Sequence, residues 1–285
     1  MNKVYACIDG LASTAAVIDW AAWSAQRLST PLEFLHVLEH QPDRAAFSDY
    51  SGAIGLGAQE ALLLELSELD ARRSKLAQDA ARQLLAFARD RATALGVTQL
   101  DARMRHGELV DTLQEAEADA RLFVLGEHYH ATRPSRIHLD HHVERVIRSV
   151  KRPVLVATQE RFEAPHRFVI AFDGSPTARK TVAMVAASPL LKGLPVLVAL
   201  AGADNATTQQ QLEWARQTLA AVGFEVTLAV VPGEPEQALP ALVQSEGAGL
   251  LVMGAYGHSR IRQLIVGSTT TTLLRLSEVP VLILR

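Results

Sequence analysis

The chain has little cysteine, little excess charge and no long apolar run. Cys7 is the only cysteine in 285 residues, which excludes an intrachain disulfide and fits a reducing compartment. The formal net charge of −3 gives no general attraction to nucleic acid or to an anionic membrane. No apolar run reaches the roughly 18 residues of a membrane span, and no signal peptide precedes the first expected strand, Val4–Ile8. We therefore expect a cytoplasmic protein.

Several motifs of nucleotide-processing enzymes are also missing. The chain contains no Walker loop (G-x4-G-K-[ST]) and no dinucleotide fingerprint (G-x-G-x-x-G). The S-G-G-x-D-S loop of ATP pyrophosphatases is absent as well. No Ser-His-Asp order and no pair of catalytic carboxylates can be identified. These absences favour a protein without a dedicated catalytic activity.

What the sequence does contain is an internal duplication. KVYACIDG near the N-terminus matches RFVIAFDG, which ends at Asp173-Gly174. LFVLGEH matches LLVMGAY, and RPVLVA matches the C-terminal VPVLIL. Each copy alternates apolar strands with helical segments, a pattern typical of parallel sheets covered by helices on both faces. The sequence therefore predicts two tandem α/β domains, at 1–158 and 166–285.

The first repeat carries an insertion. Asp9 to Gly126 spans 117 positions and Asp173 to Gly254 spans 81, a difference of 36. Most of the extra sequence is rich in Ala, Leu, Glu and Arg and has no internal Gly or Pro, which predicts one long helix over about Ala58–Leu95. Its leucines could pack on their own domain or on a second chain.

The segment after the strand Leu250–Met253 has the composition of a phosphate-binding loop. After Gly254 and Gly257, nine residues intervene before Gly267-Ser268 and four threonines at an expected helix start. Glycines allow a close approach of the backbone, and the free amides of a helix N-terminus attract anions. Arg260 would add a positive charge. The alternative is that the glycines only form turns and the hydroxyl residues only cap a helix.

The pattern G-x2-G-x9-G-[ST] after a strand resembles the ATP-binding loop of the universal stress proteins, the UspA-like family. The resemblance implies two five-stranded, doubly wound domains of the adenine nucleotide alpha hydrolase-like fold. It also implies that the second domain binds ATP with Mg²⁺. Arg260 is added to the implied residues because of its charge. The candidate binding residues are then Asp173, Gly174, Ser175, Ala201, Met253, Gly254, Gly257, Arg260, Gly267, Ser268 and Thr269. The match is weakest at Ala201. For Asp173, capping of the next helix and Mg²⁺ binding remain equal alternatives.

The first repeat departs from this pattern. After Gly126 come Glu127 and His128, and Asp140-His141 replaces the Gly-Ser pair. A carboxylate in place of a phosphate-binding glycine repels an anion, so we expect no ATP in the N-terminal domain. Histidines crowd the same loop, and His138, His141 and His142 have a spacing that suits two imidazoles on one helical face. Without an established metal motif, a solvated polar loop explains them better.

The first hypothesis for function is a stress-response or signalling regulator that binds ATP. A second is a slow Mg-dependent ATPase or an autophosphorylating enzyme, and a third is an interaction module that binds a partner or a small ligand without nucleotide. The family commonly pairs domains through the strand after the glycine loop. The resemblance thus implies intrachain pairing of RPVLVA with VPVLIL. Two such chains could then associate into a homodimer through the long helix.

Overall fold

The computed structural model describes residues 2–39, 56–127, 141–255 and 268–285, and at 56–63, 141, 268 and 269 it describes the backbone only. The strands of the first repeat are β1 (Lys3–Cys7), β2 (Leu32–Leu38), β3 (Leu100–His106), β4 (Ala120–Gly126) and β5 (Val154–Ala157). Those of the second repeat are β6 (Phe168–Ala171), β7 (Val196–Ala201), β8 (Val226–Val231), β9 (Leu251–Gly254) and β10 (Val281–Leu284).

All ten strands form one sheet in the order β3-β2-β1-β4-β5-β10-β9-β6-β7-β8. Each repeat contributes five parallel strands, and the two sets meet where β5 and β10 pair antiparallel. The doubly wound halves and their pairing through the last strand of each repeat confirm the sequence-based predictions. Because the strands of the two halves run in opposite directions at this junction, their carboxyl ends point to opposite edges of the sheet.

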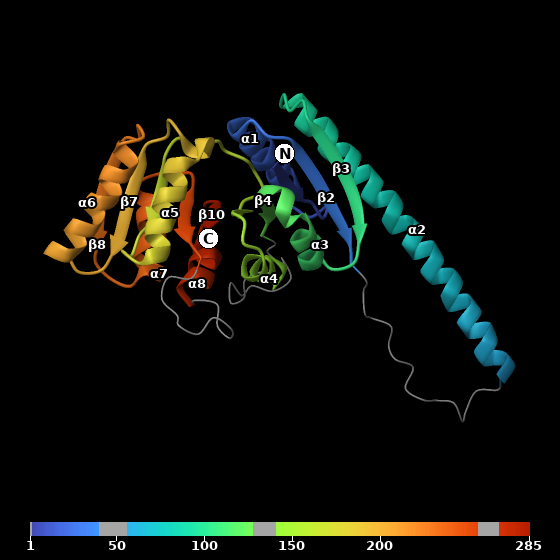
Figure 1. The fold of residues 1–285 in the computed structure, drawn as a ribbon. Coiled ribbons are helices and arrows are strands. Elements are labelled where there is room, and N and C mark those ends of the chain that lie inside the picture. The colour runs from blue at the N-terminus through green and yellow to red at the C-terminus, as the bar shows by residue number, and fades with distance from the viewer. Residues whose placement is uncertain (1, 40–55, 128–140, 256–267) are drawn as a thin grey trace.

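Helices cover both faces of the sheet (Figure 1). One face carries α1 (Thr14–Leu28), α2 (Leu56–Ala94), α5 (Pro176–Ala187) and α6 (Ala206–Ala220). The other carries α3 (Leu109–Ala116), α4 (His141–Ser149), α7 (Pro235–Ser245) and α8 (Ser268–Leu276). Two short 3-10 helices are η1 (Glu117–Asp119) and η2 (Pro189–Leu191). Within the described ranges, no helix is long and apolar enough to cross a bilayer.

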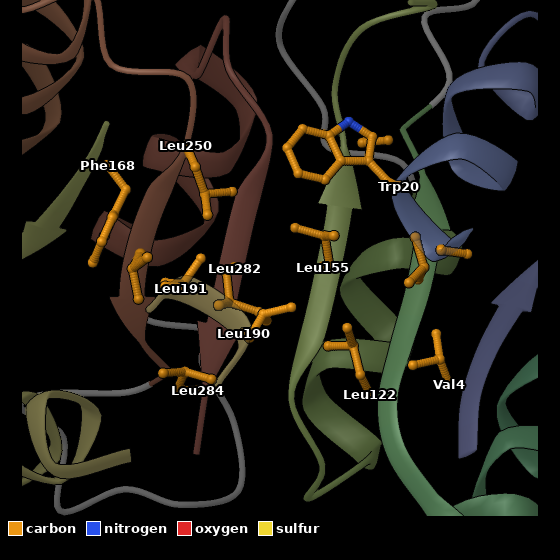
Figure 2. Close-up of a cluster of buried hydrophobic side chains, with 14 of the residues drawn as sticks. Val4, Trp20, Leu122, Leu155, Phe168, Leu190, Leu191, Leu250, Leu282 and Leu284 are labelled. Atoms are coloured by element: carbon orange, nitrogen blue, oxygen red, sulfur yellow. The ribbon is translucent and has the colours of Figure 1, made fainter. Parts of the chain in front are cut away.

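The central strands are apolar on both faces because both faces are covered. Leu155 of β5 and Leu282 of β10 are register partners and are fully buried. Figure 2 shows them within a cluster that also holds Trp20 from the first repeat and Leu190 from the second. The hydrophobic core therefore runs without interruption from one repeat into the other.

Polar contacts reinforce this junction outside the sheet. Arg27 Nε, from α1, donates to the carbonyl of Leu190 in η2 (2.8 Å), and its guanidinium lies 5.6 Å from the centre of the Trp23 ring. Arg285 Nη1 donates to the carbonyls of Arg148 (3.1 Å) and Val150 (2.5 Å) on the first repeat. Both repeats thus supply groups that hold the other in place.

The long helix predicted from composition is confirmed as α2, which has 39 residues. Only its C-terminal third packs on β2 and β3, through the buried residues Ala81, Leu85, Ala88 and Ala92. Figure 1 shows the remainder of α2 extending away from the rest of the molecule.

Candidate functional site

The candidate site lies where the strand order of the second repeat reverses. β6 and β9 are neighbours in the sheet, but the chain leaves β6 toward β7 and leaves β9 toward β10 on the other side. The helices that follow β6 and β9 cover opposite faces, so a crevice between their carboxyl ends is the usual ligand position in an open α/β sheet. Asp173-Gly174 and Gly254, which the sequence places at these ends, are brought to this edge together.

The turn after β6 is built by side-chain capping. Asp173 Oδ1 accepts a hydrogen bond from the Ser175 amide (3.0 Å), and Gly174 has φ +73°, which a residue with a side chain rarely adopts. Ser175 is the N-cap of α5, and its Oγ accepts from the Ala178 amide (3.1 Å). Asp173 and Ser175 therefore have structural roles in shaping the turn, of a kind worth about 1 kcal/mol for a cap.

Gly254 marks a close crossing between β9 and α5. A Cβ added there would lie 2.8 Å from Thr177 Cγ2 and 2.9 Å from Thr181 Oγ1. Both distances are too short for a real contact, so the backbone at the end of β9 approaches α5 as closely as it does only because residue 254 has no side chain. This explains the first glycine of the loop as a structural requirement of the crevice.

A group that the sequence analysis missed surrounds Gly174. Arg179 Nε donates to the Gly174 carbonyl (3.3 Å), and its guanidinium lies 4.6 Å from the centre of the Trp214 ring. The amide end of Gln211, from α6, occupies the space that a Cβ on Gly174 would need. Trp214 is half-buried on α6. It is one of only three tryptophans in the chain, and this scarcity is the signal in the sequence that could have pointed here.

The other predicted residues divide into three groups. Ala201 ends β7 and is half-buried, beside Val231 of β8. The Met253 side chain lies in the core beneath the α7–α8 face, so any ligand contact there would come from the backbone. Ser268 and Thr269 begin α8. Gly257, Arg260 and Gly267 lie outside the described residues.

The first turn of α8 contains a buried polar atom that finds no partner. Thr271 Oγ1 is inaccessible to solvent and makes no hydrogen bond with any residue that the structure describes. Burying a hydroxyl without a partner costs about 1–3 kcal/mol. This helix start therefore has unused hydrogen-bonding capacity close to where the glycine-rich segment ends.

The first repeat has the same frame at its own switch point. Asp9 Oδ1 accepts from the Leu11 amide (2.9 Å), Gly10 has φ +83°, and a Cβ on Gly126 would lie 2.2 Å from Ser13 Oγ. The residue after that glycine differs, because Glu127 occupies the position of Ala255 and is only 6% exposed. A buried carboxylate at this edge disfavours an anionic ligand.

The thiol and the histidines of the first repeat give no metal site among the described residues. Burial, with a smaller contribution from Asp9, raises the pKa of the Cys7 thiol well above its usual range, so it is not a nucleophile at neutral pH. His142 Nδ1 lies 3.5 Å from Glu39 Oε1. His138 lies outside the described residues, and of His141 only the backbone is described. In the described part of the chain, no three potential ligands gather around one point.

Comparisons with known proteins agree with this architecture. The profile of the Universal stress protein family matches twice, at residues 1–158 and 165–285. Universal stress protein Slr1230 of Synechocystis is 33% identical over the full length of both chains. A universal stress protein from Archaeoglobus fulgidus has the same fold, with a TM-score of 0.69 and 19% identity over 100% of this chain and 98% of its own. A universal stress protein solved in complex with cAMP covers 43% of the chain, with 98% of its own chain aligned, 27% identity and a TM-score of 0.38.

Proposed function

Because this chain belongs to the universal stress protein family, we propose that its C-terminal repeat, 166–285, binds ATP at the β6/β9 switch point. The observation that carries this proposal is that the glycine-rich segment leaves the sheet where the strand order reverses. Ligands of open α/β sheets bind at such points. The N-terminal repeat, 1–158, has the same frame but takes another role.

The residues at this edge suit a nucleotide. Adenosine would lie against the Asp173–Ser175 turn and the end of β7 at Ala201. The phosphates would bind the amides at the start of α8, where the orphaned Oγ1 of Thr271 offers a further hydrogen bond. Mg²⁺ would accompany ATP and neutralise part of the phosphate charge. A few charge-assisted hydrogen bonds and the burial of adenine, less the costs of association, give affinities on the order of micromolar.

The absence of a recognisable catalytic constellation in the sequence favours regulation over turnover. In this proposal a stress or signalling partner distinguishes the ATP-bound form of a cytoplasmic chain from its free form. ATP serves as a ligand that reports the energy state of the cell.

Replacing Gly267 by aspartate is expected to weaken ATP binding by at least about 100-fold, because a charge-assisted hydrogen bond worth about 1.5–3 kcal/mol gives way to repulsion between like charges. The substitution installs the residue that the first repeat carries at the matching position, Asp140. Equilibrium dialysis with labelled ATP and Mg²⁺ measures the change.

Gly267→Asn is the matched control, since it adds a side chain of the same size without the charge. It should weaken binding less than Gly267→Asp does. Equal affinity of the wild type and Gly267→Asp would place the nucleotide elsewhere and refute the proposed site.

A further inference from the structure

The part of α2 that leaves the body carries an exposed apolar row. Leu66, Leu69, Leu76 and Ala80, with Arg73 in the same row, are spaced alternately by three and four residues. This is the seven-residue repeat by which two helices pack along a seam. Leu69 is 53% and Leu76 is 70% exposed, and Leu66 is half-buried, so most of the row is left uncovered over the described chain.

The row lies on a different side of α2 from the residues that pack on the body of the protein. At 100° per residue, Leu85 and Ala88, two of the residues by which α2 packs on β2 and β3, lie about 140° and about 80° around the helix from the centre of the row. An exposed apolar stripe on a charged helix typically marks a binding surface for another protein.

The charges on the same segment are arranged in two blocks. Glu65, Glu68 and Asp70 come first, and Arg72, Arg73 and Lys75 follow directly. Arg72 and Glu68 form an ion pair within the helix at 3.9 Å, with side chains 77% and 63% exposed. An acidic block next to a basic block is complementary to itself when a second copy of the helix runs in the opposite direction.

We propose that α2 is the dimerisation element of this protein and pairs antiparallel with α2 of a second copy. A two-fold axis near Glu68 and Leu69 places Leu66 against Leu69 of the second copy, and Glu65 beside Arg72 of the second copy. Because a two-fold interface uses the same patch twice, each favourable pair forms twice. A parallel pair would instead set Glu65 beside Asp70, which is repulsive.

This interface is independent of nucleotide, because α2 belongs to the first repeat and lies on β2 and β3 rather than at the β6/β9 edge. Pairing would extend the molecule through the helix that Figure 1 shows projecting from it. Two chains would then present two C-terminal sites to one partner.

Sedimentation velocity on the full chain, without nucleotide, tests whether the exposed row of α2 forms a dimer interface. The wild type is expected to be a dimer with a dissociation constant on the order of micromolar, and Leu69→Glu is expected to be a monomer. Leu64→Glu is the matched control, since Leu64 is 65% exposed on the other side of the same segment. A monomeric wild type, or equal loss of the dimer in both variants, overturns the proposal.

A charge exchange tests the direction of pairing. Glu65→Arg and Arg72→Glu should each weaken the dimer at least about tenfold, because both symmetric contacts become repulsive. A 1:1 mixture of the two variants should form a heterodimer of wild-type affinity, since each opposed pair regains opposite charges. If the dimer affinity in the mixture remains as low as that of each variant alone, antiparallel pairing at this register is wrong.

Discussion

Gly254→Ala is expected to reduce ATP affinity at least tenfold and to lower the free energy of unfolding by about 1–3 kcal/mol, the usual cost of overpacking. The added Cβ would stand 2.8 Å from Thr177 Cγ2, so β9 and α5 must separate. That separation moves the start of the glycine-rich segment away from the Asp173–Ser175 turn. Urea unfolding and a titration with Mg-ATP on the same preparation measure the two effects.

The matched control is Gly126→Ala, the equivalent change in the first repeat. Its Cβ would lie 2.2 Å from Ser13 Oγ and 3.1 Å from Val17 Cγ2, so the free energy of unfolding should fall by a similar amount. ATP affinity should not change. If Gly126→Ala weakens ATP binding as much as Gly254→Ala does, the effect is a general loss of order and the C-terminal assignment fails.

Leu282→Asp is expected to cost more than about 4 kcal/mol, because it buries an ionised carboxylate in an apolar environment. Leu282 is 2% exposed in β10 and pairs with Leu155 of the other repeat. Since the core continues across this junction, both repeats should lose stability together. Urea unfolding followed by tryptophan fluorescence reports on the first half through Trp20 and Trp23 and on the second half through Trp214.

Val222→Asp is the control for Leu282→Asp, because Val222 is 43% exposed in the turn after α6. Its effect should stay within about 0.5 kcal/mol, as for ordinary surface changes. Should Leu282→Asp lower the stability of the Trp214 half alone and leave the Trp20 half unchanged, the two repeats would be independent folding units rather than one core.

Much of the fold could be predicted from sequence because the chain repeats itself. Matching KVYACIDG with RFVIAFDG fixes the first strand of each half, and the matched strands before the loops fix the fourth. The long helix was predictable for a different reason, since Ala58–Leu95 has no residue that would interrupt it, and the structure has Leu56–Ala94.

The parts that could not be predicted depend on contacts between distant residues. Arg27 reads as an ordinary end-of-helix cation, but it donates to the carbonyl of Leu190, 163 positions away. Likewise, nothing in the composition of α2 separates the third that packs on the sheet from the part that does not. That division is set by where β2 and β3 end.

The candidate site shows the same limit. In the sequence, Asp173 and Gly254 each stand at the end of a strand of an expected parallel sheet, and the carboxyl ends of such strands lie at one edge. The sequence left open whether Asp173 caps the next helix or binds Mg²⁺. In the structure Ser175 is the N-cap of α5, and Asp173 accepts a hydrogen bond from the Ser175 amide within the turn before it. Arg179 and Trp214 were not identified, because their contact depends on how α5 packs against α6.

The most direct test of the central claim is the stoichiometry of nucleotide binding. Calorimetric titration of the full-length wild type with Mg-ATP should give one site per chain, since the second repeat has Gly257 and Gly267 where the first has Tyr129 and Asp140. Two sites per chain would show that the first repeat also binds ATP. No binding at millimolar ATP would contradict the assignment of the β6/β9 edge as a nucleotide site.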